Sequence, residues 1–297
     1  MLVASLKTRP QPGKSRVIIE RKHFYLNNKC VIEKLLIKPP YRYTTIFQNE
    51  ACFLHIRKGE GHLKSPGEIL NISVSESVLL KCANYFTDFV QREGDANCEI
   101  FAVHLHKDIL KDLYKDELPG FIKADSKKHY AKKIERRDVI LHFIESLDFY
   151  FQNPALVNDE LLRLKIKELI LLLIQTNDAE NIYSLFSHLF TPRQASLNEV
   201  IQTHLYSNLS LNELATLSGR SLSAFKRDFG TFFNDTPAKY IKEQRLLKAI
   251  QLLSSTDFSI SEICYEIGFS DTSHFTKLFK LKYNLTPSEY RKTKSLK

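Results

Sequence analysis

The sequence predicts an α+β chain. We expect an N-terminal β-rich, cupin-like barrel or sandwich with a helical appendix, then a C-terminal all-α domain in which a long helix joins two helix-turn-helix units. Before His106 the chain consists of short runs in which apolar and polar residues alternate. After His106 the apolar residues recur at helical spacing, and one segment occurs twice near the C-terminus. These observations predict a first domain at 1–190, with its β part at about 17–106 and its helices at about 107–176, and a second domain at 191–297.

The β part consists of short apolar or alternating runs separated by clusters of glycine, proline and asparagine. Short strands at such spacing are typical of a small sandwich or barrel. We expect strands at Lys22–Tyr25, Thr44–Phe47, Cys52–Arg57, Ile69–Val74, Ser77–Cys82 and Cys98–His106. The Gly59-Glu-Gly61 sequence is predicted to form a hairpin turn.

Helical patterns begin after the last predicted strand. Lys107–Glu117 is predicted to be a short helix that ends before Pro119-Gly120, and longer helices are expected at about 128–151 and 157–176. Within the last of these, Leu161–Ile174 becomes apolar on every side. A helix of this kind must be buried, either against its own domain or against a second subunit.

Composition narrows the possible classes of protein. The net charge of +9 suits an anionic partner without naming it. Five cysteines without C-x-x-C spacing argue against a disulfide framework or a zinc site and favour the reduced cytoplasm. The longest apolar run, Leu169–Ile174, is too short to span a membrane, and the N-terminus has no signal-peptide core. Residues 1–15 are expected to form a flexible arm, and Asn177–Ser184 with Thr191–Ser196 to form the linker.

The most informative feature is the repeated segment. Ser210–Ser221 is echoed by Ser259–Ser270, and the offset between the copies is 49 residues up to the second serine and 50 after it. Each copy continues into a helical pattern with two phenylalanines and then reaches Thr-Pro. Two helix-turn-helix units in one chain are typical of a protein that reads two neighbouring segments of DNA.

Both copies carry the same local signals. Each begins with a capping box, turns at a glycine and caps its second helix with a serine. The paired positions are Ser210/Ser259 and Glu213/Glu262 for the capping box, Gly219/Gly268 for the turn, and Ser221/Ser270 for the second cap. Thr286–Glu289 is a further capping box, and Pro237–Ser254 is predicted to be one long helix between the copies.

The second helix of each copy is expected to bury its phenylalanines, Phe225/Phe229 and Phe275/Phe279. Small, hydroxyl and basic residues then remain outward at its exposed start, and these residue types match base edges and phosphates. The candidate DNA-binding residues are Ser223, Ala224, Lys226 and Arg227 in the first copy and Thr272, Ser273, His274 and Lys277 in the second. The alternative is that these are solvated helix faces, but two copies with matching caps, glycines and prolines favour DNA.

This repeat resembles the DNA-binding domain of the AraC/XylS family of bacterial transcription regulators. The resemblance covers about 195–292, and the most specific stretch is Ser259–Leu281 with Asn284–Tyr290. It implies that both recognition helices enter successive major-groove segments through the eight residues named above. It also implies an activator whose partners are promoter DNA and RNA polymerase.

The N-terminal half more loosely resembles the β-rich companion domain of the same family, in particular the ExsA-type branch related to type III secretion activators. Leu161–Leu173 carries this likeness. The resemblance implies self-association into a homodimer through the helices, and control by a regulatory protein.

Three hypotheses remain at this level. The first is a regulator whose β domain senses a small molecule, and the second is one controlled by a protein. The third is a metal-dependent cupin-type enzyme, because His104 and His106 share a strand face and could touch one ion. No further ligands are evident, so we assign no metal, cofactor or catalytic residue. The state of the β-domain interior, open or filled by side chains such as Phe47, Phe53 and Phe101, separates the first two.

Overall fold

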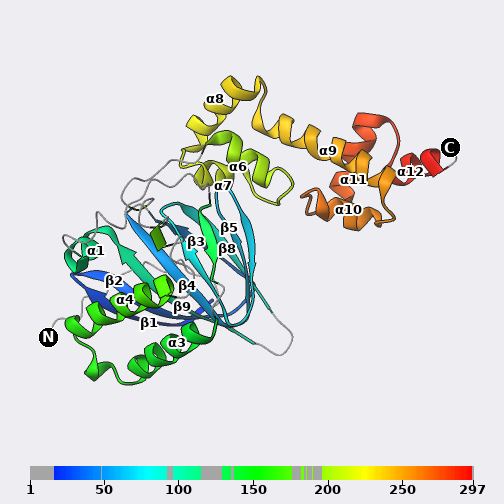
Figure 1. Cartoon of the computed structure of the whole chain (residues 1–297). Helices are drawn as coiled ribbons and strands as arrows, with labels where there is room; N and C mark the ends of the chain where they lie inside the picture. Colours follow the sequence, from blue (N-terminus) through cyan, green and yellow to red (C-terminus); the bar gives the residue numbers. More distant parts are fainter. Residues whose placement is uncertain are drawn as a thin grey trace.

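The computed structural model describes residues 17–47, 49–91, 96–114, 129–134, 137–175, 182–183, 185, 189 and 196–295. In this part of the chain two β-sheets face each other, and helices cover one of them (Figure 1). The helices of the C-terminal part follow one another away from the strands (Figure 1). The predicted α+β class is confirmed. The arm at 1–15, the stop at Pro119-Gly120, most of the linker and the boundary at 190/191 lie outside the described residues.

The two sheets hold all the strands of the described residues. A six-stranded sheet has the order β1-β2-β9-β4-β7-β10, a four-stranded sheet has the order β3-β8-β5-β6, and the paired strands run antiparallel. The strands are β1 (Ile18–Leu26), β2 (Lys29–Ile37), β3 (Tyr41–Ile46), β4 (Glu50–Lys58), β5 (Glu60–Lys64), β6 (Ile69–Ile72), β7 (Glu76–Leu80), β8 (Asn84–Val90), β9 (Cys98–His106) and β10 (Ala131–Lys133). The sequence did not predict β2, β5, β8 or β10.

Two local predictions in the N-terminal domain were wrong. The helix expected from about 128 begins only at Arg137, because Ala131–Lys133 pairs with β7 and completes the sheet edge. The turn at Gly59 is not a hairpin, since β4 pairs with β7 and β9 whereas β5 belongs to the other sheet. Gly59 instead makes a sharp turn between sheets at φ +85°, where an added Cβ would lie 2.3 Å from the Cys98 sulfur.

Helices cover the outer face of the six-stranded sheet (Figure 1). They are α1 (Lys107–Tyr114), α3 (Arg137–Gln152), the 3-10 turn η2 (Pro154–Leu156) and α4 (Asp159–Leu173). Phe53 and Phe101 of the sheet are fully buried in the core that these helices close. Asp148 of α3 ties the helix to the sheet through ion pairs of 2.6 Å with Lys34 and with Arg57. No helix in the described ranges is long and apolar enough to cross a membrane.

The C-terminal domain contains the predicted repeat. Its helices are α6 (Leu197–His204), α7 (Leu211–Leu217), α8 (Leu222–Phe233), α9 (Pro237–Ser255), α10 (Ile260–Glu266), α11 (Thr272–Tyr283) and α12 (Pro287–Ser295). Both capping boxes form, and the two turn glycines have positive φ, as predicted. All four repeat phenylalanines are fully buried.

The one-residue offset between the copies has a structural explanation. Ser221 caps α8 by accepting a hydrogen bond from the Ala224 amide, as predicted. Ser270 does not cap α11, because Asp271 takes that position and accepts from the amides of Ser273 and His274. Asp271 is therefore the counterpart of Ser221, and Ser270 is the extra residue in the turn.

The first helix-turn-helix unit packs against the four-stranded sheet, and its apolar core is continuous with side chains of that sheet. Polar contacts accompany this packing. His204 Nε2 lies 2.6 Å from the carbonyl oxygen of Ser65, and Asn84 Nδ2 donates to the carbonyl oxygen of Thr216 at 2.5 Å. The β domain and the first unit therefore form one packed body.

A charged network crosses the same interface. Arg42 of β3 pairs with Asp88 of β8 and with Glu213 of α7, and Lys64 Nζ lies 2.7 Å from Asp88 Oδ2. Glu213 also accepts the Ser210 backbone N–H of the capping box at 2.7 Å. Glu213, the glutamate of the α7 capping box, thus also joins this helix to the β domain.

We expect Glu213→Gln to lower the stability of the full chain by about 1 kcal/mol, because glutamine keeps the cap but loses the charge that pairs with Arg42. Glu262→Gln is the matched control, since Glu262 occupies the same position in the second capping box. This control should leave the unfolding midpoint nearly unchanged. Thermal unfolding followed by circular dichroism measures both variants.

The difference between wild type and Glu213→Gln should disappear in acid. Burial opposes ionisation of Glu213, but hydrogen bonds from Ser210 and Arg42 outweigh it and hold its pKa below the ordinary 4.5. A carboxylate with a depressed folded pKa stabilises the fold above its unfolded pKa, and this contribution is lost as the pH falls through the folded pKa. If Glu213→Gln and Glu262→Gln lower the stability of the chain equally, the ion pair between Glu213 and Arg42 contributes nothing to it.

Candidate recognition helices and the cavity of the β-sandwich

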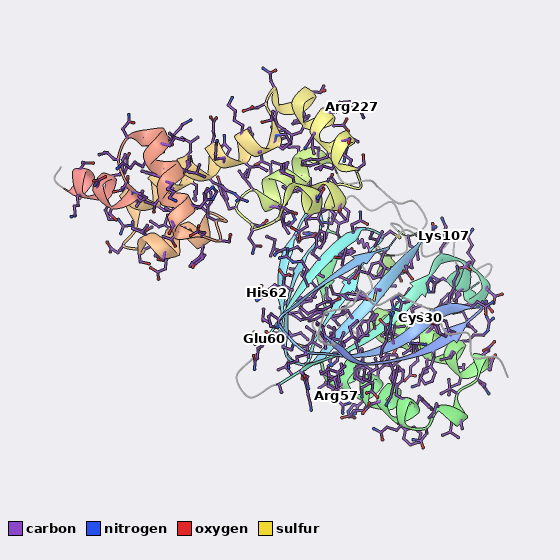
Figure 2. The ribbon with its side chains drawn as sticks, turned by 180° about the vertical axis from the view of Figure 1, so that it is seen from behind. Cys30, Arg57, Glu60, His62, Lys107 and Arg227 are labelled. Atoms are coloured by element: carbon purple, nitrogen blue, oxygen red, sulfur yellow. The ribbon has the colours of Figure 1, made fainter. Side chains whose placement is uncertain are left out.

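The first candidate recognition surface is the start of α8. Phe225 and Phe229 fix the inner side of this helix, which leaves Ser223, Lys226 and Arg227 exposed. Ala224 is half-buried. The Arg227 side chain is 76% exposed and lies 3.2 Å from Asp228 on the helix surface. Figure 2 shows Arg227 on α8, on the side away from the sheets.

The second candidate surface is the start of α11. Ser273, His274 and Lys277 are exposed, and Thr272 is half-buried. The cap at Asp271 fixes the backbone at this end of the helix. All eight predicted residues therefore lie in the first turns of the two second helices, four on each, and their contacts with DNA stay a prediction.

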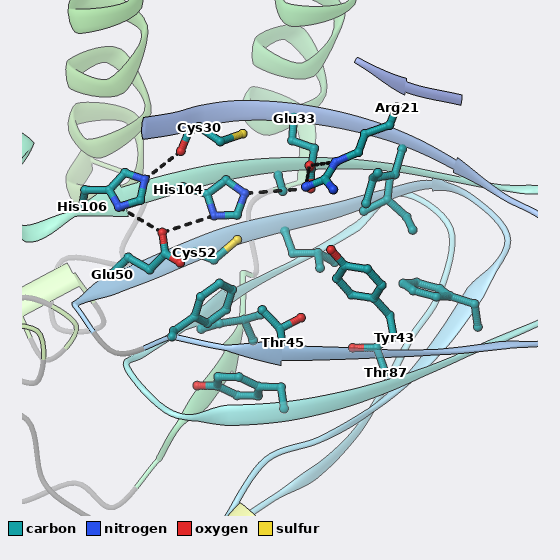
Figure 3. A pocket seen from close by; sticks show the side chains of 18 residues that line it. Arg21, Cys30, Glu33, Tyr43, Thr45, Glu50, Cys52, Thr87, His104 and His106 are labelled. Atoms are coloured by element: carbon teal, nitrogen blue, oxygen red, sulfur yellow. Dashed lines mark hydrogen bonds and ion pairs between the residues drawn. The ribbon is translucent and has the colours of Figure 1, made fainter. Parts of the chain in front are cut away.

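A cavity of about 310 Å³ lies between the two sheets (Figure 3). Its walls are mostly apolar, and its size is at the lower end of small-molecule sites. Of the three phenylalanines considered from sequence, only Phe47 lines it, because Phe53 and Phe101 face the helix-covered core. The interior is open. The lining residues are Arg21, Cys30, Glu33, Leu35, Tyr43, Thr45, Phe47, Glu50, Cys52, Leu54, Leu80, Tyr85, Thr87, Phe89, Ile100, Ala102, His104 and His106.

One end of the cavity is polar. The Arg21 guanidinium lies 2.5 Å from Glu33, and Glu50 Oε2 lies 3.0 Å from His106 Nδ1. His104 stands between these pairs, with its ring nitrogens 3.7 Å from Glu50 and 4.0 Å from Glu33 (Figure 3). Its buried Nδ1 has no hydrogen-bond partner among the described residues. A bound molecule could supply that partner.

The pKa values of the titratable groups at this end are shifted in different directions. Burial lowers the pKa of His104, despite the nearby carboxylates, so its ring is neutral at pH 7. For His106, hydrogen bonds to Glu50 and to the Cys30 carbonyl outweigh burial and raise the pKa. Burial raises the pKa of the Cys30 thiol to about 12 and that of Cys52 well above its ordinary value. Neither thiol is a nucleophile at neutral pH.

The structure also clarifies the predicted histidine pair. His104 and His106 do share a face, and their rings are stacked with centroids 6.1 Å apart. Sequence reasoning missed Glu50, which the pairing of β4 with β9 places opposite His106. Only the register of two strands distant in sequence reveals this neighbour. Within the described residues no group of three or more histidine, cysteine, aspartate or glutamate side chains is arranged to hold a metal ion.

Comparison with known proteins gives two matching family models. One, described as a helix-turn-helix domain, matches residues 193–293, and the other, described as the ExsA N-terminal regulatory domain, matches residues 51–185. The virulence regulon transcriptional activator VirF of Yersinia enterocolitica is 34% identical over 134 residues, which are 45% of this chain and 49% of VirF. The regulator ExsA of Pseudomonas aeruginosa is 32% identical over 131 residues, which are 44% of this chain and 47% of ExsA.

The chain thus spans about half the length of the curated relatives it matches. Among solved structures, ToxT from Vibrio cholerae with a bound unsaturated fatty acid is 16% identical, with a TM-score of 0.37 over 88% of this chain and 94% of ToxT. VirF and ExsA are described as transcription regulators, so the comparisons give no support to a cupin-type enzyme. The matches at both ends agree with the repeat and with the β-rich companion domain, and the chain belongs to the AraC/XylS family of transcription regulators, in the branch with an ExsA-type N-terminal domain.

Proposed function

We propose that this chain is a sequence-specific DNA-binding transcription activator, which acts in the cytoplasm on promoter DNA with RNA polymerase as its partner. The observation that carries the proposal is the pair of exposed helix starts on α8 and α11. Each presents hydroxyl and basic side chains on a helix whose opposite face is held by two buried phenylalanines. Such residues can bond base edges in the major groove, and a basic surface favours the phosphate backbone.

We further propose that the cavity binds a small molecule as the regulatory signal. Its apolar walls suit an apolar or aromatic body, and the polar end suits a head group that donates hydrogen bonds to His104, Glu33 or Glu50. An anionic head beside His104 would lie between the carboxylates of Glu33 and Glu50, which repel it, and their pairing with Arg21 and His106 offsets only part of this repulsion. The favoured signal is therefore a small amphiphile with a neutral or cationic head.

Self-association is the third part of the proposal. Most of the apolar residues in α4 are used inside the subunit, but Leu164 and Leu171 are 55% and 52% exposed. They lie seven residues apart and so share one face of the helix. Phe149 of α3 is also 52% exposed. We propose that Leu164 and Leu171, with Phe149 as a further exposed apolar side chain of the covering helices, join two copies of the chain and raise affinity for paired sites through effective concentration.

For DNA binding, we expect Arg227→Ala to weaken the full chain on its preferred site by about 1–3 kcal/mol and to relax preference at one base pair, because arginine pairs with guanine. Lys58→Ala, which removes an exposed positive charge on β4 of the N-terminal domain, should leave binding unchanged. Fluorescence anisotropy on single-base variants of a selected site measures this. A uniform loss across sequences assigns Arg227 to phosphate, and wild-type binding that is insensitive to salt contradicts the proposal.

For the cavity, we expect phenethylamine at millimolar concentration to raise the unfolding midpoint of the full chain more than 3-phenylpropanoate does. The two probes share an aromatic body and differ in the charge of the head group. Thr45→Phe, which fills the cavity from β3, should abolish both responses. A stronger response to the carboxylate contradicts the proposed ligand class, and no response to either probe favours control by a protein.

For self-association, we expect the full chain to sediment as a dimer at micromolar concentration, and Leu164→Glu or Leu171→Glu to produce monomers. Both side chains are exposed, so the variants should fold with unchanged circular dichroism. Leu247→Glu is the control, because Leu247 of α9 is similarly exposed at 49% but lies in the other domain. A wild-type monomer, or dissociation by the control variant alone, contradicts this interface.

A further inference from the structure

Arg245 of α9 contacts both helix-turn-helix units at once. Its Nε and Nη2 atoms donate to the carbonyl oxygens of Leu205 and Ser207, at 2.9 and 2.5 Å, in the loop between α6 and α7 of the first unit. Its Nη1 atom donates at 2.9 Å to the carbonyl oxygen of Gly268, in the turn of the second unit. One guanidinium therefore bridges three backbone positions that belong to two different units.

The turn of the second unit lies directly against the loop of the first. Gly268 has φ +83°, and a Cβ added there would lie 2.5 Å from the carbonyl oxygen of Tyr206. The Arg245 guanidinium also lies 5.7 Å from the centroid of the Phe269 ring. That ring contacts Phe275, at 5.5 Å between centroids, and the exposed His274 at 6.0 Å. The contact thus reaches the start of α11, where the candidate DNA-binding residues lie.

The apolar cores do not fix the two units relative to each other. The core of the first unit includes Ile241 of α9, whereas the core of the second includes Leu246, Ala249 and Leu253. Each unit therefore packs on its own part of the long helix. The contacts at Arg245 and Gly268 supply restraints between the units beyond the helix itself. A planar guanidinium with several fixed donors can satisfy three carbonyls in a way that a lysine ammonium cannot reproduce.

We propose that Arg245 is a positioning residue for DNA recognition, which sets the separation and relative rotation of α8 and α11. The proposal rests on the proposed function, in which both helices read one face of DNA about one helical turn apart, roughly 10 bp. A fixed geometry makes binding depend sharply on the spacing between the two DNA segments. Without the bridge, the second unit gains freedom, and the preference for one spacing weakens.

The test uses the full chain and a DNA site selected from a random library by the wild-type protein. The site is rebuilt with one base pair inserted or deleted between the two segments, and affinities are measured by anisotropy. We expect the wild type to lose about tenfold in affinity on each altered site, corresponding to about 1.4 kcal/mol. Arg245→Lys, which keeps the charge, should lose no more than about threefold, or about 0.7 kcal/mol. Leu247→Ala, an exposed neighbour on α9, should keep the wild-type spacing preference.

Gly268→Asn provides a second variant that perturbs the same contact from the other unit. Asparagine tolerates positive φ better than other residues with a side chain, but its Cβ must displace the Tyr206 carbonyl. The variant should also weaken or shift the spacing preference. Equal losses at every spacing in both variants would show that the contact serves stability only and would overturn the proposal. A wild type that binds but shows no spacing preference would instead refute two-helix recognition, and a wild type that selects no site would refute the proposed function itself.

Discussion

Strand β8 separates the cavity from the first helix-turn-helix unit, and this shared wall is the constraint on which the arrangement of the two domains depends. Tyr85, Thr87 and Phe89 line the cavity, while the alternating residues Asn84 and Asp88 contact the C-terminal domain directly or through Arg42. Successive side chains of a strand point to opposite faces. A single strand therefore supplies both the cavity lining and the docking surface, and a shift of its register by one residue would exchange the two sets.

The two copies of the repeat obey the same local rules in different tertiary surroundings. Glu213 and Glu262 each complete a capping box, but Glu213 also pairs with Arg42 of the β domain. The core of the first unit merges with that of the sheet, whereas the second unit has a separate core. The repeat thus provides one unit packed against the N-terminal β-sheets and another joined to the first unit by α9 and by the contacts of Arg245.

The sequence was most informative where structure depends on local chemistry. Capping boxes, turn glycines and helical spacing of phenylalanines act within a few residues, so the helices of the C-terminal domain and the exposure of six of its eight candidate residues could be predicted, whereas Ala224 and Thr272 are half-buried. The assignment of Ser270 as a cap was wrong because Asp271, one position later, competes for the same role.

Features that depend on distant pairing were not predicted. Ala131–Lys133 forms a strand because it pairs with the edge of β7, and the sequence pattern places it in the helix expected from about 128. In the same way, the approach of Glu50 to His106 follows from the register of β4 against β9. The bridge from Arg42 to Glu213 requires knowledge of how the domains pack. Composition and periodicity carry no information on such registers.

The length of α9 gives the docked arrangement a mechanical consequence. The helix has 19 residues, which at about 1.5 Å each make an arm of about 28 Å. Its near end belongs to the unit held on the sheet, and its far end carries the core of the second unit. Over this length, a tilt of α9 by about 5° at its docked end moves its far end by about 2.5 Å. This displacement is close to the rise of about 3.4 Å between successive base pairs. Small rearrangements at the sheet surface are therefore amplified along the arm to the scale of one step on the double helix.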